Sequence, residues 1–329
     1  MRAVQFILCL ALMLSVISCE QESKDPNDVG GLNKKDYTET KVFGYVNRDG
    51  DMVIEPRYSR ASESSEGFAL TTFGYIDHNG EVKIENEFLH AYSFSEGLAA
   101  AQPEGESHYG YIDKEGKYVI EPKYLMAQPF SEGMARVWSA NTSEASQGFI
   151  DKTGEYVIPP ELEGIEYYGG YGNFFDGRAL VAKTTNSKDG SMIEYGFIDK
   201  MGTVVIEPQF YEAGHFSEGL AAVTFEHDGK WGYINTDGTI AIEPRFDGAG
   251  VFSEGFTGVN IDGKWGFIDS VGNMAIEPQF EGAGIFSEGL AAVKVGEKWG
   301  YIDNNGNMVI EPQYEDAGYF SEGLAPVRF

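Results

Sequence analysis

The chain has 329 residues, a formal net charge of −28, 42 glycines and an aromatic content of 14%. So acidic a surface repels nucleic acid and anionic lipid headgroups and excludes them as expected partners, whereas cationic partners are attracted to it. Both cysteines, Cys9 and Cys19, lie near the start, so the rest of the chain has no thiol for a disulfide, a metal or a nucleophile. The glycine-rich, aromatic-rich composition favours many short strands joined by turns.

Residues 1–18 are predicted to be a lipoprotein signal peptide. Arg2 supplies a positive start, and the apolar run that follows it is too short to span a bilayer comfortably. The run ends in "VISC", which resembles a bacterial lipobox, so Cys19 is expected to carry lipid and to become the first mature residue. The alternative is an ordinary cleaved signal in which Cys19 is incidental.

Residues 19–41 are predicted to be the lipidated cysteine and a flexible tether, because this segment is polar and has no hydrophobic periodicity. The lipobox resemblance implies an exported, membrane-anchored protein. Glu20, rather than Asp, follows Cys19. That favours the outer membrane or the cell surface of a bacterium over retention at the inner membrane.

Residues 42–329 are predicted to form eight copies of one unit. The copies are aligned on Gly, an aromatic residue, Ile or Val, and Asp or Asn, with steps of 30 to 48 residues between them. Periods in this range are typical of repeat architectures, in which one unit cannot bury its own apolar face. The starting glycines are Gly44, Gly74, Gly110, Gly148, Gly196, Gly232, Gly266 and Gly300.

Each unit is predicted to be a three-stranded antiparallel meander, which makes the fold all-β. In the last unit "GYID" is the first strand, and Asp303 to Gly306 form a type I turn with a left-handed Gly bulge into the second strand, "NMVIEP". Pro312 then stops the ladder, because proline has no N–H to donate. A crossover ending in "FSEG" leads to a third strand of the type "LAAV".

A large ring precedes the starting glycine in most copies, for example Trp265 and Trp299. A glycine beside such a ring usually marks backbone pressed against another element, so we expect the rings to join neighbouring units. The alternative is an exposed aromatic ladder that stacks on sugars.

The lines "KWGYID", "VIEPQF" and "FSEGLAAV" resemble the bacterial WG-repeat family over essentially all of 42–329. The resemblance is tight from residue 196 onward and looser before it. It implies a β-rich repeat protein, exported or modular, and it brings no enzymatic activity and no catalytic residue. The preferred arrangement is an open solenoid-like array, because the steps are unequal and propeller blades usually have four strands. The alternative is a closed eight-bladed β-propeller.

No catalytic constellation or cofactor motif emerges from the residues, so the protein is expected not to be an enzyme and to need no cofactor. An acid precedes the glycine of every crossover, and these acids invite two interpretations. Stacked carboxylates could hold Ca²⁺, or each acid caps the backbone of a neighbouring unit or pairs with the lysine before Trp-Gly. They are Glu66, Glu96, Glu132, Asp176, Glu218, Glu254, Glu288 and Glu322.

Departures from the repeat indicate where a partner binds. The hairpin before each starting glycine varies most in length, and insertions at one point of every unit project from one side of the molecule. The fourth unit has a crossover rich in rings, and Tyr167, Tyr168, Tyr171 and Phe174 are the candidate ligand-binding residues. The alternative is a degenerate but packed crossover.

The sequence thus predicts a lipid-anchored, non-catalytic scaffold that binds a protein or glycan partner. The alternative is a structural component of the cell envelope without a small ligand.

Overall fold

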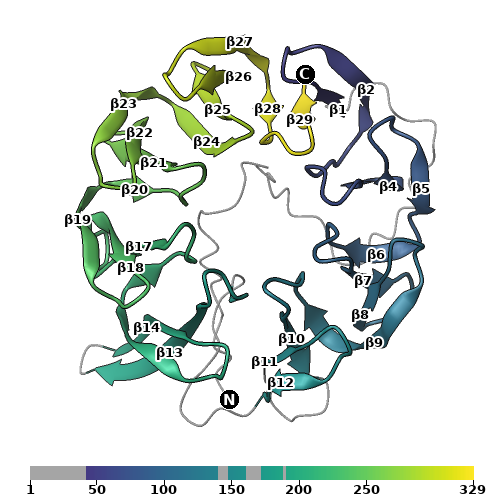
Figure 1. The fold of residues 1–329 in the computed structure, drawn as a ribbon, viewed down its shortest axis with the longest axis horizontal. Coiled ribbons are helices and arrows are strands. Elements are labelled where there is room, and N and C mark those ends of the chain that lie inside the picture. Colours follow the sequence, from purple (N-terminus) through teal and green to yellow (C-terminus); the bar gives the residue numbers. More distant parts are fainter. Residues whose placement is uncertain (1–41, 140–146, 161–171, 188–189) are drawn as a thin grey trace.

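The computed structural model describes residues 42–139, 147–160, 172–187 and 190–329, in which every regular element is a β-strand. The all-β prediction is confirmed. Small antiparallel sheets stand side by side around a common axis and form a closed ring of eight blades (Figure 1). No helix long and apolar enough to cross a membrane occurs in this part of the chain.

A regular blade has four antiparallel strands in the order β20-β21-β22-β23. The strand β20 (Gly248–Ala249) is only two residues long, and the "LAAV"-type strand is β21 (Phe256–Ile261). The Trp-Gly strand is β22 (Lys264–Asp269), and the Ile-Glu-Pro strand β23 (Met274–Phe280) lies on the rim of the ring (Figure 1). The next blade begins immediately after β23.

The other blades repeat this plan, and we number them from the blade that holds both chain ends. Blade 1 comprises β28 (Asp316–Ala317), β29 (Ala325–Arg328), β1 (Phe43–Val46) and β2 (Met52–Tyr58); blade 2 comprises β3 (Ala69–Thr71), β4 (Gly74–Ile76) and β5 (Val82–Glu85); blade 3 comprises β6 (Phe88–Ala91), β7 (Ala99–Pro103), β8 (Tyr109–Ile112) and β9 (Tyr118–Ala127). Blade 4 comprises the end of β9 with β10 (Ala135–Ser139), β11 (Gln147–Ile150) and β12 (Tyr156–Ile158); blade 5 comprises β13 (Ala179–Ser187), β14 (Gly190–Ile198) and β15 (Val204–Phe210). Blade 6 comprises β16 (Glu212–Ala213), β17 (Leu220–Thr224), β18 (Trp231–Asn235) and β19 (Ile240–Phe246); blade 7 is β20 to β23; blade 8 comprises β24 (Gly282–Ser287), β25 (Leu290–Val295), β26 (Lys298–Asp303) and β27 (Met308–Tyr314).

The blades straddle the sequence repeats, which corrects the predicted three-stranded unit. The "LAAV" strand of one repeat pairs with the Trp-Gly strand of the next, as Val259 does with Gly266 and Val293 with Gly300. A short segment after the rim strand adds a fourth strand in six of the eight blades within the described residues, as β6, the end of β9, β16, β20, β24 and β28. These segments escaped the sequence pattern because three of them are only two residues long.

The ring is closed, so the preferred open array was wrong and the alternative of a closed eight-bladed propeller is correct. Strand β29, from the C-terminal end, pairs with β1, and Phe43 lies opposite Arg328. The offset between blades and repeats explains the closure. The first Trp-Gly strand, β1, and the last "LAAV"-type strand, β29, complete one blade together, so the edges that remain are the inner and rim strands of each blade.

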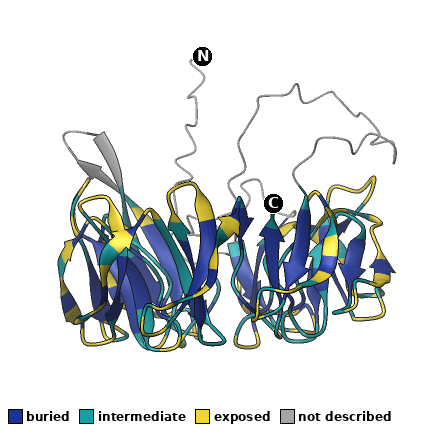
Figure 2. Ribbon diagram, turned by 90° about the horizontal axis from the view of Figure 1, so that it is seen from above, coloured by how far each residue is buried: buried dark blue, intermediate teal, exposed yellow. Residues whose placement is uncertain are grey.

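The core is a chain of small apolar clusters in which buried Ile, Phe and Tyr side chains alternate with small residues. The inner strands are largely buried, whereas the rim strands alternate buried with exposed residues, and further exposed residues lie in the loops at the two faces of the ring (Figure 2). Each Asp-x-x-Gly turn forms as predicted: Asp303 Oδ1 accepts the N–H groups of Asn305 (2.9 Å) and Asn307 (2.8 Å), and Gly306 has a φ of 82°.

The tryptophan rings before the starting glycines of blades 7 and 8 pack inside their blades. A Cβ added to Gly282 would lie 2.9 Å from the Trp299 ring, and one added to Gly248 would lie 3.4 Å from the Trp265 ring. These indoles therefore join the end of one sequence repeat to the start of the next, as expected. Trp299 is buried and Trp265 is half-buried, so the two rings do not belong to an exposed ladder for sugars.

Candidate functional site

The Ser-acid-Gly motif is a two-residue hairpin turn. Both central residues have positive φ, with 54° at Glu288 and 79° at Gly289, which is the geometry of a type I′ turn. A left-handed conformation costs an ordinary residue about 1–2 kcal/mol, so an acid at this position of every repeat needs a compensating contact.

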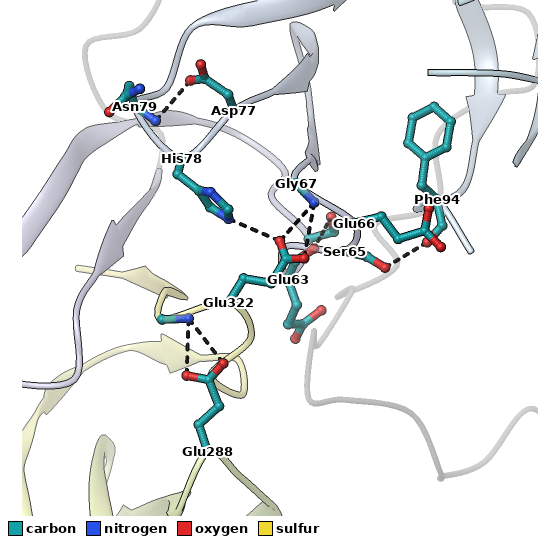
Figure 3. A network of polar contacts seen from close by, with 12 residues as sticks. Glu63, Ser65, Glu66, Gly67, Asp77, His78, Asn79, Phe94, Glu288 and Glu322 are labelled. Carbon is teal, nitrogen blue, oxygen red and sulfur yellow. Dashed lines mark hydrogen bonds and ion pairs between the residues drawn. The ribbon is translucent and has the colours of Figure 1, made fainter. Parts of the chain in front are cut away.

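That contact is a hydrogen bond to the next blade. The carboxylate of each acid accepts the backbone N–H of the glycine in the following turn, and Figure 3 shows Glu322 receiving the N–H of Gly67 (3.0 Å). The pairs close the circle: Glu66–Gly97, Glu96–Gly133, Glu132–Gly177, Asp176–Gly219, Glu218–Gly255, Glu254–Gly289, Glu288–Gly323 and Glu322–Gly67.

Basic side chains contact several of these acids. Lys114 lies 3.2 Å from Glu66, and His78 lies 3.0 Å from Glu322 (Figure 3). The capping interpretation of the repeated acids is confirmed, although the lysines concerned follow the Ile-Asp pair rather than precede Trp-Gly. In the described residues no group of three or more His, Cys, Asp or Glu is placed to hold a metal ion.

A second joint runs beside the first. In Figure 3 the Ser65 hydroxyl donates to the carbonyl of Phe94 in the next crossover (2.7 Å), and Ser95 donates to Phe130 in the same way. Serine, acid and glycine of the motif are therefore used to fasten blade to blade. This leaves the repeated positions little chemistry for a ligand.

The predicted aromatic site in the fourth repeat is only partly described. Cys19, Tyr167, Tyr168 and Tyr171 lie outside the described residues and stay predictions. Phe174 was wrong as a ligand-binding residue: it is fully buried, and its ring centroid lies 4.8 Å from that of Phe149. It occupies the place that the "FSEG" phenylalanine takes in other repeats, so core packing explains why this position is a phenylalanine.

The variable hairpins lie on one face of the ring. Every hairpin that joins an "LAAV" strand to a Trp-Gly strand leaves its blade in the same direction, because the strands run alike in all blades. Strands β29 and β1 occupy the same two places in blade 1, so Phe43 and Phe329 lie at this face too, where the C-terminal end is seen in Figure 2. We call it the hairpin face.

A cavity of about 260 Å³ opens at the hairpin end of blade 6. Tyr211 and Glu212, beside β17, form one side, and Trp231 of β18 forms another. Three further acids line it together with Thr224 and Gly229: Glu226 and Asp228 come from the hairpin between β17 and β18, and Asp247 follows β19. We call it the blade 6 pocket.

The pocket exists because blade 6 departs from the regular pattern. Glu212 stands opposite Thr224, at the position that Gly248 and Gly282 occupy in blades 7 and 8. There the indole packs over the glycine. In blade 6 the side chain of Glu212 takes the place of the glycine hydrogen, and the indole of Trp231, half-buried like that of Trp265, forms a wall of the cavity.

Sequence reasoning missed this pocket, although a signal was present. The lengths of the loops between units do not reveal it, whereas the residues that follow the rim strand do. The change from Asp247-Gly248 to Tyr211-Glu212 at that point marks the departure. A second, larger cavity of about 580 Å³ lies between blades 2 and 3, lined by Ile84, Phe88 and several charged residues.

Solved structures that resemble this chain include distant, propeller-like proteins of varied function. Apo AztD from Citrobacter koseri is 14% identical, with 88% of this chain and 99% of that one covered at a TM-score of 0.42. Hsv2 from Kluyvelomyces marxianus is 10% identical, with 80% and 92% covered at a TM-score of 0.45. Neither similarity bears on function. A comparison with curated protein sequences found no match.

The profile of one protein family, described as the WG containing repeat, matches eight consecutive segments of the sequence. They are residues 43–71, 73–105, 109–137, 148–183, 195–230, 231–265, 265–299 and 299–329. Together these segments cover most of the chain, from the first blade strand to the last residue. The chain therefore belongs to the WG-containing repeat family.

Proposed function

We propose that the protein is an exported, lipid-anchored β-propeller scaffold that binds a protein or glycan partner through its hairpin face and catalyses no reaction. The observation that carries the proposal is the division of labour between constant and variable positions. The constant residues form hydrogen bonds between neighbouring blades, such as Glu322 with Gly67 and Ser65 with Phe94. Much of the variation falls in loops at one face, where recognition residues on rigid scaffolds are commonly found.

The lipid anchor is part of the proposal. The segment that would connect Cys19 to the propeller enters at Phe43, on the hairpin face. Fully extended, residues 19–41 would reach about 80 Å, which leaves the ring free to turn either face to the membrane. The tether therefore does not prevent the hairpin face from meeting a partner.

A capture experiment with two variants tests the proposal. The mature chain, residues 19–329 with Cys19→Ser to keep it soluble, would be used to capture partners from the native envelope. The first variant has residues 163–171 shortened, which spares the buried Phe174. The second has the hairpin between Thr224 and Trp231 shortened by two residues, to the length of its equivalent between Asn260 and Trp265.

We expect a partner that binds the full hairpin face and is lost from one of the two variants, both still folded by circular dichroism. Capture that survives shortening of both loops would contradict recognition at this face. No capture by any version would favour the alternative, a structural envelope component. A variant altered on the opposite face, Asn304→Lys, serves as the control and should capture normally.

A further inference from the structure

We infer that the blade 6 pocket receives a guanidinium group, such as an arginine side chain carried by the partner. The inference rests on the proposed function and names the chemistry by which the partner is recognised. Blade 1 and blade 6 of the same ring differ at the position that faces this pocket.

Blade 1 contains an internal guanidinium at the equivalent place. Asp316 stands in β28 where blade 6 has Glu212, and Arg328 stands opposite it where blade 6 has Thr224. Arg328 Nη2 lies 3.5 Å from Asp316 Oδ2, and the guanidinium carbon of Arg328 lies over the ring of Phe43, 5.4 Å from its centroid. One cation thus bridges a carboxylate and an aromatic ring at the end of the blade.

Blade 6 has the carboxylate and the ring but lacks the cation. Trp231 occupies the position of Phe43, and Thr224 offers only a hydroxyl, which donates to the carbonyl of Glu226 (3.1 Å). An indole is the best of the aromatic faces for a cation. The cavity of about 260 Å³ beside it is the space that an arginine from outside would enter.

The charges of the pocket favour a cation. Lys230 forms an ion pair with Asp247. Lys264 and Glu281 form the equivalent ion pair one blade further on (2.7 Å). Within the described parts of the chain, no hydrogen bond or ion pair engages the carboxylates of Glu212 and Glu226. Carboxylates of this kind pair with guanidinium in a bidentate manner, and their attraction adds to that of the aromatic ring.

The remaining charged groups do not neutralise the site. His227 Nδ1 lies 2.8 Å from Asp228 Oδ2, and its ring centroid lies 5.3 Å from that of Tyr211. Both His227 and Asp228 are largely exposed. An incoming guanidinium therefore meets a surplus of negative charge, framed by Tyr211 and Trp231.

The test is a titration of the mature chain with capped arginine peptide, followed by the indole N–H resonances in a two-dimensional NMR spectrum. The chain has four tryptophans, so the Trp231 signal can be assigned from one Trp231→Phe variant. The matched neutral probe is the same peptide with citrulline, which keeps the shape and loses the charge. Free agmatine tests whether the guanidinium must be part of a peptide.

We expect saturable shifts of the Trp231 signal with the arginine peptide, at least ten-fold weaker binding of the citrulline peptide, and weaker binding at high salt. Glu212→Gly restores the regular glycine of blades 7 and 8, and Thr224→Arg supplies the internal cation of blade 1. Both should abolish the shifts. Glu243→Gln, which removes a charge from the exposed rim strand of the same blade, should leave them unchanged.

Equal binding of the arginine and citrulline peptides would overturn the inference, as would full binding by the folded Glu212→Gly variant. Binding of agmatine without the peptide would overturn the assignment to a partner's arginine. The outcomes are separable from those of the capture experiment. If a partner is captured equally by Glu212→Gly and the wild type, the proposed function stands and the pocket inference fails.

Discussion

The acid of the Ser-acid-Gly turn combines an unfavourable backbone conformation with a favourable hydrogen bond. Glu254 has a φ of 55°, which is unfavourable for a residue with a Cβ, yet its carboxylate accepts the N–H of Gly289 at 2.8 Å. A hydrogen bond to a charged group contributes about 1.5–3 kcal/mol, and partial exposure places this one at the lower end. The contact therefore offsets the backbone strain.

Glu254→Ala should lower the free energy of unfolding by about 1–2 kcal/mol, because alanine keeps the strained backbone and loses the acceptor. Glu254→Gly should leave the free energy of unfolding nearly unchanged, because glycine removes the backbone strain together with the hydrogen-bond acceptor. Urea unfolding of the two variants checks this. Equal destabilisation by alanine and glycine would show that the strain is not released.

Glu63 is an irregular residue at the seam where the ring closes. It is labelled in Figure 3, and it stands where other repeats have Val251 and Ile285. Burial raises the pKa of the Glu63 carboxyl, and the negative charge of Asp316 raises it further. When the pKa of a carboxyl is higher in the folded than in the unfolded state, the free energy of unfolding falls as the pH rises from the unfolded pKa to the folded pKa.

Glu63→Gln should therefore stabilise the ring at pH 7 and have a smaller effect at pH 5, where the wild-type carboxyl is closer to protonated. Thermal unfolding of both proteins at the two pH values measures the difference. A melting temperature that changes equally at both would mean that the carboxylate charge is not the cause.

At the scale of the element, the Asp-x-x-Gly turn sets each hairpin between a Trp-Gly strand and its rim strand. Asp269 Oδ1 accepts the N–H groups of Val271 (3.0 Å) and Asn273 (2.8 Å). The backbone N–H of Asn273 is the main cause that holds the pKa of Asp269 below its usual value. For Asp303 the side-chain amide of Asn307 is the main cause that lowers the pKa, and the backbone N–H of Asn307 comes next. These groups favour the fold above the ordinary carboxyl pKa, and that stability is lost as pH falls.

Asp269→Asn and Asp303→Asn together should flatten the acid limb of the stability curve below about pH 4, because asparagine keeps the acceptor oxygen and does not titrate. At pH 7 the double variant should lose stability, since a neutral acceptor is weaker. Denaturant midpoints between pH 3 and 7 provide the measurement. An unchanged acid limb would assign the pH dependence to other carboxylates.

At the scale of the whole molecule, the ring depends on one pairing between the two ends of the described chain. Strand β29 contributes the fully buried Val327 to blade 1, and Phe43 lies opposite Arg328. Around the seam, a Cβ added to Gly50 would lie 3.4 Å from Ile310, so the last repeat packs on the first as any repeat packs on its neighbour.

Removal of residues 325–329 should cost about 3 kcal/mol or more, since it exposes buried side chains and leaves β1 without a partner on one edge. The loss should appear as a lower denaturant midpoint and a larger hydrodynamic radius. The matched control is a circular permutant that joins Phe329 to Phe43 by a short hairpin and opens the chain at Gly263. It should keep the native stability within about 1 kcal/mol, because the ring has no privileged blade. A truncated chain as stable as the permutant would contradict the role of the seam.

The sequence by itself determined the repeat, its strands and its turns, because these follow from local chemistry. An Asx residue and a left-handed glycine specify the turn wherever Asp303 and Gly306 recur, and Pro312 stops a ladder in any context. Closure was decided by the tertiary structure, since it depends on the small rotation between blades, which no single unit encodes. The same holds for the blade 6 pocket: Glu212 is one exposed acid among many in the sequence, and only the neighbouring blades reveal that a packed glycine normally stands there.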